Sequence, residues 1–420
     1  MNKYPIYLVL LFGAIRLEAQ VTYQSVADRF QLYFNRQQSD SIFNMYSSDV
    51  KEKLPLEKNR TVMEGLHIQF GDLKALDVIQ QDTGYANYKA TFKDQTLTLV
   101  LALSKEGLIE GLRFIPYTSP QTPLQKMESK SNIVLKTDAG NIYGSLKVPE
   151  GNNKMPVLLI IAGSGPTDRN GNQVSGLTTN TYKMIADSML KRGIATLRYD
   201  KRGIGESAGG MKSEKELVFE NYINDAAGFI RMLKSDKRFS KVIVLGHSEG
   251  SLIGMVAART AQADAFISIA GAGDRIDRVI EEQLRSQSPE MAAKATVLFD
   301  SLNKGYSVEP EADLLYLFRP SVQPYLQSWL KYNPRKEISM LQIPVLIIQG
   351  TTDIQVAIQD AQMLKSACPS AKLVLINQMN HVLKQSGFGK QENMSTYNNP
   401  ELPVKTELIN AVDAFVRTVK

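Results

Sequence analysis

The fold of this chain is decided by residues 241–258, which read KVIVLGHSEGSLIGMVAA. Residues 242–245 form an apolar, β-branched run that predicts a buried strand, and residues 251–258 predict a helix. The run Gly-His-Ser-Glu-Gly at 246–250 joins the two. A strand, a sharp turn and a helix provide the context of a nucleophile elbow, in which the turn strains the serine backbone and lifts its hydroxyl off the sheet. We therefore predict that Ser248 is a nucleophile.

The Gly-x-Ser-x-Gly pattern occurs a second time, at residues 205–209. There the preceding strand ends at Asp200, four residues intervene, and another glycine with a polar stretch separates the pattern from the next helix. This context predicts a long, glycine-rich surface loop rather than an elbow. We therefore favour Ser248 over Ser207 as the nucleophile.

A serine nucleophile needs a base, and the chain has three histidines. His67 lies far upstream in the first part of the chain. His247 is adjacent to Ser248, so its side chain should point away from the path of attack. His381 follows the last predicted strand, residues 373–376, in a loop. Because the base belongs in a loop after a late strand, we predict that His381 is the base.

The acid that orients this base should follow a strand end between the serine and the histidine. Asp353 meets this condition, because it closes the loop Gly-Thr-Thr-Asp after the predicted strand at 343–349. Asp274 is the alternative, since it follows the preceding predicted strand at 265–270. We favour Asp353.

An oxyanion intermediate needs two backbone N–H donors. The first should be Glu249, the residue after the nucleophile, at the start of a helix. The second should come from the loop Ala-Gly-Ser-Gly-Pro at 162–166, with Ser164 as the first choice and Gly165 as the next. Pro166 cannot donate. A phosphate-binding loop is the competing interpretation, but no Lys-Ser or Lys-Thr pair follows it.

Short apolar runs without alternation recur downstream of residue 132 and predict strands that are covered on both faces. Helical patterns lie between these strands, at 222–233 and at 404–419 for example. The rhythm predicts an α/β fold, doubly wound around a mostly parallel sheet. Residues 274–340 contain helical segments without a buried strand, and we expect them to form a helical cap. The predicted strands occupy residues 155–162, 194–199, 242–245, 265–270, 343–348 and 373–376.

The first part of the chain predicts a different, smaller domain at residues 20–117. Apolar residues at helical spacing near 26–34 and 42–46 are followed by two-residue alternation at 88–92 and 97–103. Helices followed by an antiparallel sheet make an α+β domain. A polar, proline-containing linker at residues 118–131 connects it to the catalytic part, residues 132–420.

Residues 1–19 are typical of a signal peptide, with Lys3 before an apolar run of about a dozen residues and Leu-Glu-Ala before the cut. This run is too short to span a bilayer. No cysteine lies near the cut, so we expect a secreted or periplasmic protein without a stable membrane anchor. The lone cysteine, Cys368, cannot form an internal disulfide.

Composition narrows the range of partners. The net charge is +6, from 49 basic and 43 acidic residues, and the basic residues form no long run, which argues against nucleic-acid binding. Three scattered histidines offer no metal-ligand cluster, so neither a metal nor another cofactor is expected. The oligomeric state stays open.

Several motifs, taken in order, resemble the bacterial α/β-hydrolases related to acyl esterases and to prolyl-oligopeptidase-like hydrolases. The resemblance covers residues 132–420 and implies that the segment around Ser207 is structural. One departure is Ala162, where many relatives carry histidine or serine. The small first domain resembles the cone-shaped nuclear-transport-factor kind that is fused ahead of such hydrolases. The motifs occupy residues 163–170, 198–207, 246–250, 350–353 and 380–381.

These features predict a serine hydrolase that cleaves a small-molecule carboxylic ester through an acyl-enzyme. A serine peptidase or aminoacyl-amide hydrolase is the alternative within enzymes, although the first domain is too short for the propeller that usually precedes prolyl oligopeptidases. A non-catalytic binding protein on a hydrolase scaffold is the third hypothesis.

Overall fold

The computed structural model describes residues 22–81, 85–93, 95–117, 132–151, 154–173, 177–285, 288–311 and 314–419. The chain forms two compact units, residues 1–117 and residues 118–420. The predicted signal peptide, residues 1–19, and the predicted linker, residues 118–131, lie outside the described residues.

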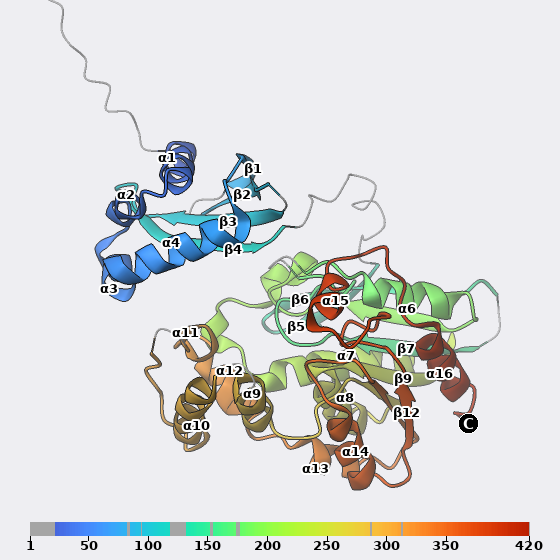
Figure 1. The fold of residues 1–420 in the computed structure, drawn as a ribbon. Coiled ribbons are helices and arrows are strands. Elements are labelled where there is room, and N and C mark those ends of the chain that lie inside the picture. Colours follow the sequence, from blue (N-terminus) through green and yellow to red (C-terminus); the bar gives the residue numbers. More distant parts are fainter. Residues whose placement is uncertain are drawn as a thin grey trace, which may run out of the picture. The chain divides into compact units, whose positions relative to one another are not determined.

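The N-terminal unit places its helices first and its sheet afterwards (Figure 1, blue to cyan). The sheet is antiparallel, in the order β1-β2-β3-β4. Along β2 the buried residues alternate with partly buried ones, so one face packs on the helices in a core that includes Phe30, Phe34 and Tyr88. The elements are α1 (Tyr23–Asn35), α2 (Ser39–Asn44), α3 (Ser48–Lys53), α4 (Leu56–Phe70), β1 (Ala75–Gln81), β2 (Ala86–Thr91), β3 (Thr96–Leu103) and β4 (Ile109–Pro116).

The C-terminal unit is built on an eight-stranded sheet in the order β12-β11-β10-β9-β7-β8-β6-β5. The six strands from β12 to β8 in this order run parallel, and β6 and β5 add an antiparallel edge. The strands are β5 (Ile133–Thr137), β6 (Gly140–Lys147), β7 (Met155–Ile161), β8 (Ala195–Tyr199), β9 (Phe239–His247), β10 (Ala265–Ile269), β11 (Val345–Gly350) and β12 (Lys372–Ile376). The predicted α/β fold with a mostly parallel sheet and a separate small α+β domain is confirmed.

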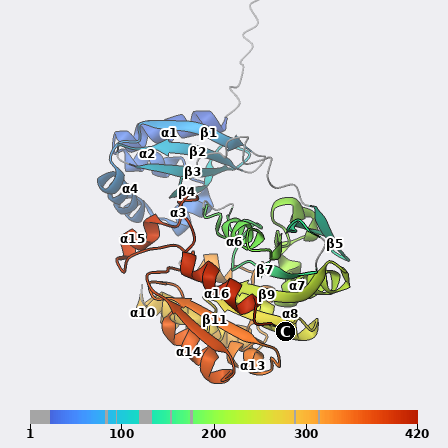
Figure 2. The same ribbon diagram turned by 90° about the vertical axis from the view of Figure 1, so that its right-hand side faces the viewer.

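Both faces of this sheet are covered by helices, which explains the unbroken apolar runs of its strands. Alternate residues of β7 show the division. Leu159 packs with α7 and α8 in one core, whereas Leu158 packs with α6 and α16 in the other. Figure 2 shows α6 and α16 beside the strands. The helices outside the cap are α6 (Thr181–Leu190), α7 (Phe219–Ser235), α8 (Glu249–Thr260), α14 (Ile358–Ala367), α15 (Lys390–Ser395) and α16 (Thr406–Val416), with 3₁₀ helices at Gly205–Gly210 (η1) and Glu214–Glu216 (η2).

Five helices lie between β10 and β11, and no strand occurs in the described part of residues 274–340. The helices have a core of their own, which includes Leu284, Phe299 and Phe318. We call this segment the cap. Its helices are α9 (Ile276–Arg285), α10 (Pro289–Asn303), α11 (Leu315–Phe318), α12 (Gln323–Trp329) and α13 (Pro334–Ser339).

Candidate active site

Ser248 stands at the turn between β9 and α8, with φ 54° and ψ −122°. A positive φ is uncommon for a residue with a side chain and stores strain in the backbone. The turn is tight because its glycines leave no room for a Cβ. A Cβ on Gly246 would lie 2.6 Å from the carbonyl carbon of Gly250. The Ser248 N–H donates to Ile269 O on β10 at 2.9 Å, which ties the turn to the sheet.

His381 lies in the loop that follows β12, and its Nδ1 is 2.8 Å from Asp353 Oδ2. Both side chains are buried, with 8% and 1% exposed. Asp353 Oδ1 also accepts the backbone N–H groups of Gln355 and Val356 at 2.8 and 3.0 Å. Burial alone would raise the pKa of Asp353, but the neighbouring His381 and the backbone donors outweigh it and lower the pKa below the usual value. The carboxylate therefore stays ionised and can orient the imidazole.

Ser248 and His381 line the same two cavities, of about 530 and 360 Å³. The larger cavity is mostly bounded by apolar side chains, many of them from the cap, such as Val279 and Leu326. Within the described chain no hydrogen bond joins Ser248 Oγ to His381 Nε2. Such contacts are often loose without substrate and tighten in the complex. A reacting carbonyl that entered either cavity would meet the hydroxyl and the imidazole together.

The predicted oxyanion donors lie around the same serine. Glu249 is the first residue of α8, where the helix N-terminus favours negative charge. Ser164 and Gly165 line both cavities with Ser248. Gly163, just before them, approaches so closely that an added Cβ would lie 3.2 Å from the Cβ of Ser248. The structure thus gathers the three residues predicted as donors on the walls of the cavities that Ser248 lines.

Comparison with known proteins identifies the family of this chain. The family described as "Hydrolase_4: Serine aminopeptidase, S33" matches residues 175–385, just over half of the chain. The chain belongs to this family. It is an α/β-hydrolase and a serine hydrolase.

Among curated proteins, this serine hydrolase is similar to "Esterase EstD" of Thermotoga maritima, at 28% identity over 393 residues that cover 91% of each chain. Solved structures with a similar fold include Est1E from Butyrivibrio proteoclasticus with ferulic acid bound (TM-score 0.46, 17% identity, 68% of this chain and 98% of that one). A thermophilic esterase from Thermogutta terrifontis is similar at a TM-score of 0.41 and 16% identity, over 69% of this chain and 99% of that one.

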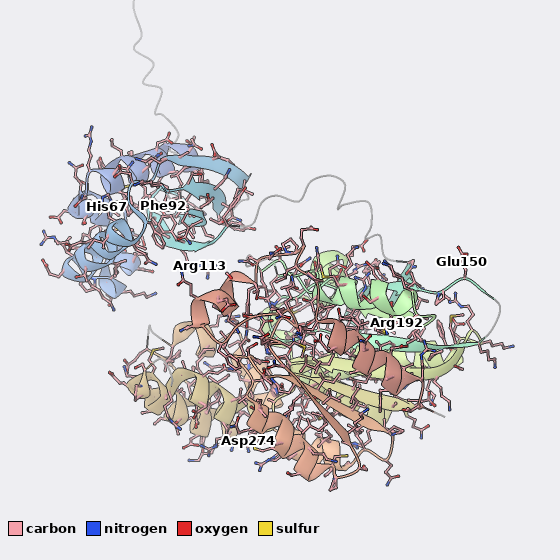
Figure 3. The ribbon with its side chains drawn as sticks, turned by 45° about the vertical axis from the view of Figure 1, so that its right-hand side comes forward. His67, Phe92, Arg113, Glu150, Arg192 and Asp274 are labelled. Carbon is pink, nitrogen blue, oxygen red and sulfur yellow. The ribbon has the colours of Figure 1, made fainter. Side chains whose placement is uncertain are left out.

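The alternatives considered for the site of this hydrolase lie elsewhere or are otherwise engaged. Asp274, labelled in Figure 3, pairs with Arg335 at 3.0 Å at the start of the cap. Ser207 is fully buried in η1, and its Oγ accepts the Tyr143 N–H at 2.8 Å. His67 belongs to α4 of the N-terminal unit, as Figure 3 shows. The structure therefore brings Asp353, not Asp274, to His381.

His247 has a structural partner on each side of its ring. Its Nε2 lies 2.9 Å from His381 O, and its Nδ1 lies 2.8 Å from Tyr182 OH. Burial, and to a lesser extent the neighbouring His381, lower the pKa of His247 to about 3. A neutral imidazole must then donate from Nε2 to the carbonyl and accept from the tyrosine at Nδ1. His247 thus links the turn at the nucleophile to the loop that carries the base.

Some residues around the site were not predicted from the sequence. Tyr182 and Lys201 both contact the loop that precedes Ser164, and Gln349 donates to Asp353 Oδ2 at 3.1 Å. A signal for Lys201 existed, because it lies in the motif at 198–207. The described residues contain no group of three or more metal-ligating side chains. None of the helices described is long and apolar enough to cross a membrane.

Proposed function

We propose that this serine hydrolase cleaves carboxylic esters through an acyl-enzyme. Ser248 Oγ attacks the ester carbonyl while His381 Nε2 takes its proton. The backbone N–H groups of Glu249 and Ser164 bind the oxyanion. His381 then returns the proton to the leaving alcohol, and water, activated by the same imidazole, releases the acid. One observation carries the proposal: His381, whose Nδ1 is held by the buried Asp353, lines the same two cavities as a serine held at φ 54°.

An ester is a better substrate for this site than an aminoacyl amide. An aminopeptidase must hold a substrate ammonium group, which calls for a carboxylate with no other cation beside it. The three acidic residues that line the larger cavity each already face a basic side chain: Glu214 faces Arg319, Glu249 faces Lys201, and Asp274 faces Arg335. The similarity to a protein named an esterase, along 91% of the chain, supports the same choice.

Three measurements test this proposal. A fluorophosphonate probe should label Ser248 in the folded protein, and turnover should be faster on short p-nitrophenyl esters than on matched aminoacyl p-nitroanilides. Asp353→Asn should lower kcat by about 10⁴-fold, because the imidazole loses the partner that fixes its tautomer.

Asp274→Asn is the matched control, since Asp274 is the alternative acid, pairs with Arg335 and does not touch His381. Its kcat should stay within about threefold of wild type. Failure of the probe to label Ser248 would favour a binding protein, and faster cleavage of the anilides would favour an aminopeptidase.

We also propose that residues 1–19 are removed on export, so that the enzyme acts in the periplasm or the medium. The proposal is supported by the charge and the apolar run of this segment. N-terminal sequencing of the exported protein should find a start near Gln20. An intact N-terminus on a cytoplasmic protein would contradict it.

A further inference from the structure

A buried ion pair lies beside the nucleophile and has no part in the triad. Lys201, just after β8, places its Nζ 2.6 Å from Oε2 of Glu249, and only 4% and 3% of the two side chains are exposed. Tyr325 OH of α12 donates to the other oxygen of Glu249. The ammonium also lies 4.2 Å from the centre of the Tyr222 ring, a distance at which a cation is attracted to the ring face.

Lys201 makes a second contact, with the loop that carries the predicted oxyanion donor Ser164. Its Nζ donates to Gly163 O at 3.1 Å, while the Gly163 N–H donates to Tyr182 OH at 3.0 Å. The peptide bond between Gly163 and Ser164 is planar and trans, so its C=O and its N–H point in opposite directions. A lysine that holds Gly163 O therefore also fixes the direction of the Ser164 N–H.

The charge on Lys201 is maintained by its partner. Burial disfavours the ammonium and would lower its pKa, but Glu249 more than offsets this effect and raises the pKa above the usual value. Buried ion pairs seldom add much net stability compared with apolar residues, so stability is a weak explanation for this one. Its placement is specific, because the same ammonium contacts the residue after the nucleophile and the loop of the second donor.

We propose that Lys201 is a positioning residue for the oxyanion site, which it holds together by binding Gly163 O and the Glu249 carboxylate at once. This inference rests on the proposed acyl transfer. The transition state then meets two N–H groups, those of Ser164 and Glu249, that are already aligned. Preorganised donors stabilise a developing charge more than the ground state, so the effect should fall on kcat rather than on KM.

The decisive experiment measures Lys201→Met for turnover and for binding of a transition-state analogue. An alkylboronic acid is suitable, because it adds to the serine as a tetrahedral anion. Removal of one oxyanion donor from an enzyme costs about 10²- to 10³-fold in kcat. A donor that is only misdirected should cost about 10- to 100-fold. We expect that loss in kcat, an equal loss in boronate affinity, and a KM within about threefold of wild type.

Lys201→Met leaves Glu249 buried without a cation and could fail to fold. The double variant Lys201→Met with Glu249→Gln removes both charges, keeps the backbone N–H at 249, and should show the same losses. Asp225→Asn is the control for weakening a buried pair, since Asp225 binds Arg202 at 2.6 Å, has a 1% exposed side chain and does not line the cavity. It should lower the unfolding temperature without changing boronate affinity.

The outcomes separate this inference from the proposed function. Full turnover by Ser248→Ala would overturn the proposed function. An inactive Ser248→Ala combined with a folded single or double variant whose kcat and boronate affinity match wild type would overturn the role of Lys201 alone. Loss of folding in both Lys201 variants would assign the pair to stability and would also overturn that role.

Discussion

Residues 205–209 and 246–250 share the Gly-x-Ser-x-Gly pattern but differ in what surrounds their serines. Ser207 is fully buried, and its hydroxyl is the acceptor for the Tyr143 N–H. Ser248 is partly exposed and lines two cavities, and its hydroxyl has no hydrogen-bond partner among the described residues. The Ser207 hydroxyl is engaged in a structural hydrogen bond, whereas the Ser248 hydroxyl is free to react with a substrate.

The glycines of the two segments differ as well. A Cβ on Gly250 would lie 2.6 Å from Ala162 O and would also collide with Ile161 O, at the end of β7. A Cβ on Gly209, the matching position, would meet no atom within 4 Å. A glycine is required at position 250 because the backbone at the end of β7 lies directly against it. The comparison teaches that the pattern specifies only the spacing of the glycines and the serine. The strands and helices on either side determine whether that serine is structural or a candidate nucleophile.

The largest difference between the two segments is expected when each serine is replaced by alanine. Ser248→Ala should lower kcat by about 10⁴-fold or more, because no other hydroxyl can replace the nucleophile, and should change the free energy of unfolding by less than about 0.5 kcal/mol. Ser207→Ala should keep ester turnover but lower the stability of the protein. It leaves the Tyr143 N–H without its acceptor and should cost about 1–3 kcal/mol of stability. Ester turnover and urea unfolding of both variants are the measurements.

The two variants act as controls for each other. A Ser207→Ala enzyme that folds stably but loses turnover would reverse the assignment of the two segments. Equal effects of both changes on stability would show that burial of the Ser207 hydroxyl has no special importance.

The second test concerns the last glycine of each segment. Gly250→Ala should destabilise the protein by about 3 kcal/mol or more, since the new methyl group collides with rigid backbone at the end of β7. Gly209→Ala points its methyl group into open space and should stay within about 0.5 kcal/mol of wild type. Thermal unfolding of the two variants checks the difference. Similar losses at both positions would mean that β7 can move away from the turn.

Much of the fold could be predicted because burial on both faces leaves a clear trace in the sequence. The apolar runs at 155–162 and 265–270 became β7 and β10. The antiparallel edge of β5 and β6 was not predicted, because β6 contains two glycines and mixes buried with partly buried residues. Helix α4 was also missed, since only Asn59 and Met63 of its fifteen residues are buried.

The candidate site also includes features that could not be predicted from the sequence. Ser248, Asp353 and His381 could be proposed from the sequence because each follows a strand end, and chain order then suggests their roles. The buried contact of Lys201 was not predicted, since a lysine is usually an exposed residue and its partner Glu249 lies 48 positions away. Tyr182 contacts His247 across 65 positions. Such contacts depend on how α6 and the loops pack, which the periodicity of the sequence does not specify.

The smallest expected effect on stability comes from the residue before each serine. This residue is Glu206 in residues 205–209 and His247 in residues 246–250. The unfolded chain protonates His247 below about pH 6.5, whereas the folded protein resists protonation down to about pH 3. In that window the unfolded state binds more protons, so stability falls as acid is added. His247→Gln removes this effect but weakens the contacts with Tyr182 and His381 O, at a cost of about 1–2 kcal/mol at pH 7.5.

The variant should therefore be less stable than wild type at pH 7.5, and this disadvantage should vanish or reverse by pH 4.5, because two pH units of protonation of the unfolded state alone cost wild type about 2.7 kcal/mol. Urea unfolding at the two pH values measures it. Asp225, whose pKa is raised to about 6 by burial in spite of Arg202, titrates equally in both proteins and cancels in the difference. A constant difference between pH 7.5 and 4.5 would mean that His247 is not held neutral. The residue before Ser248 would then carry a charge in the folded protein at low pH and would not serve as a neutral link between the turn and the loop of His381.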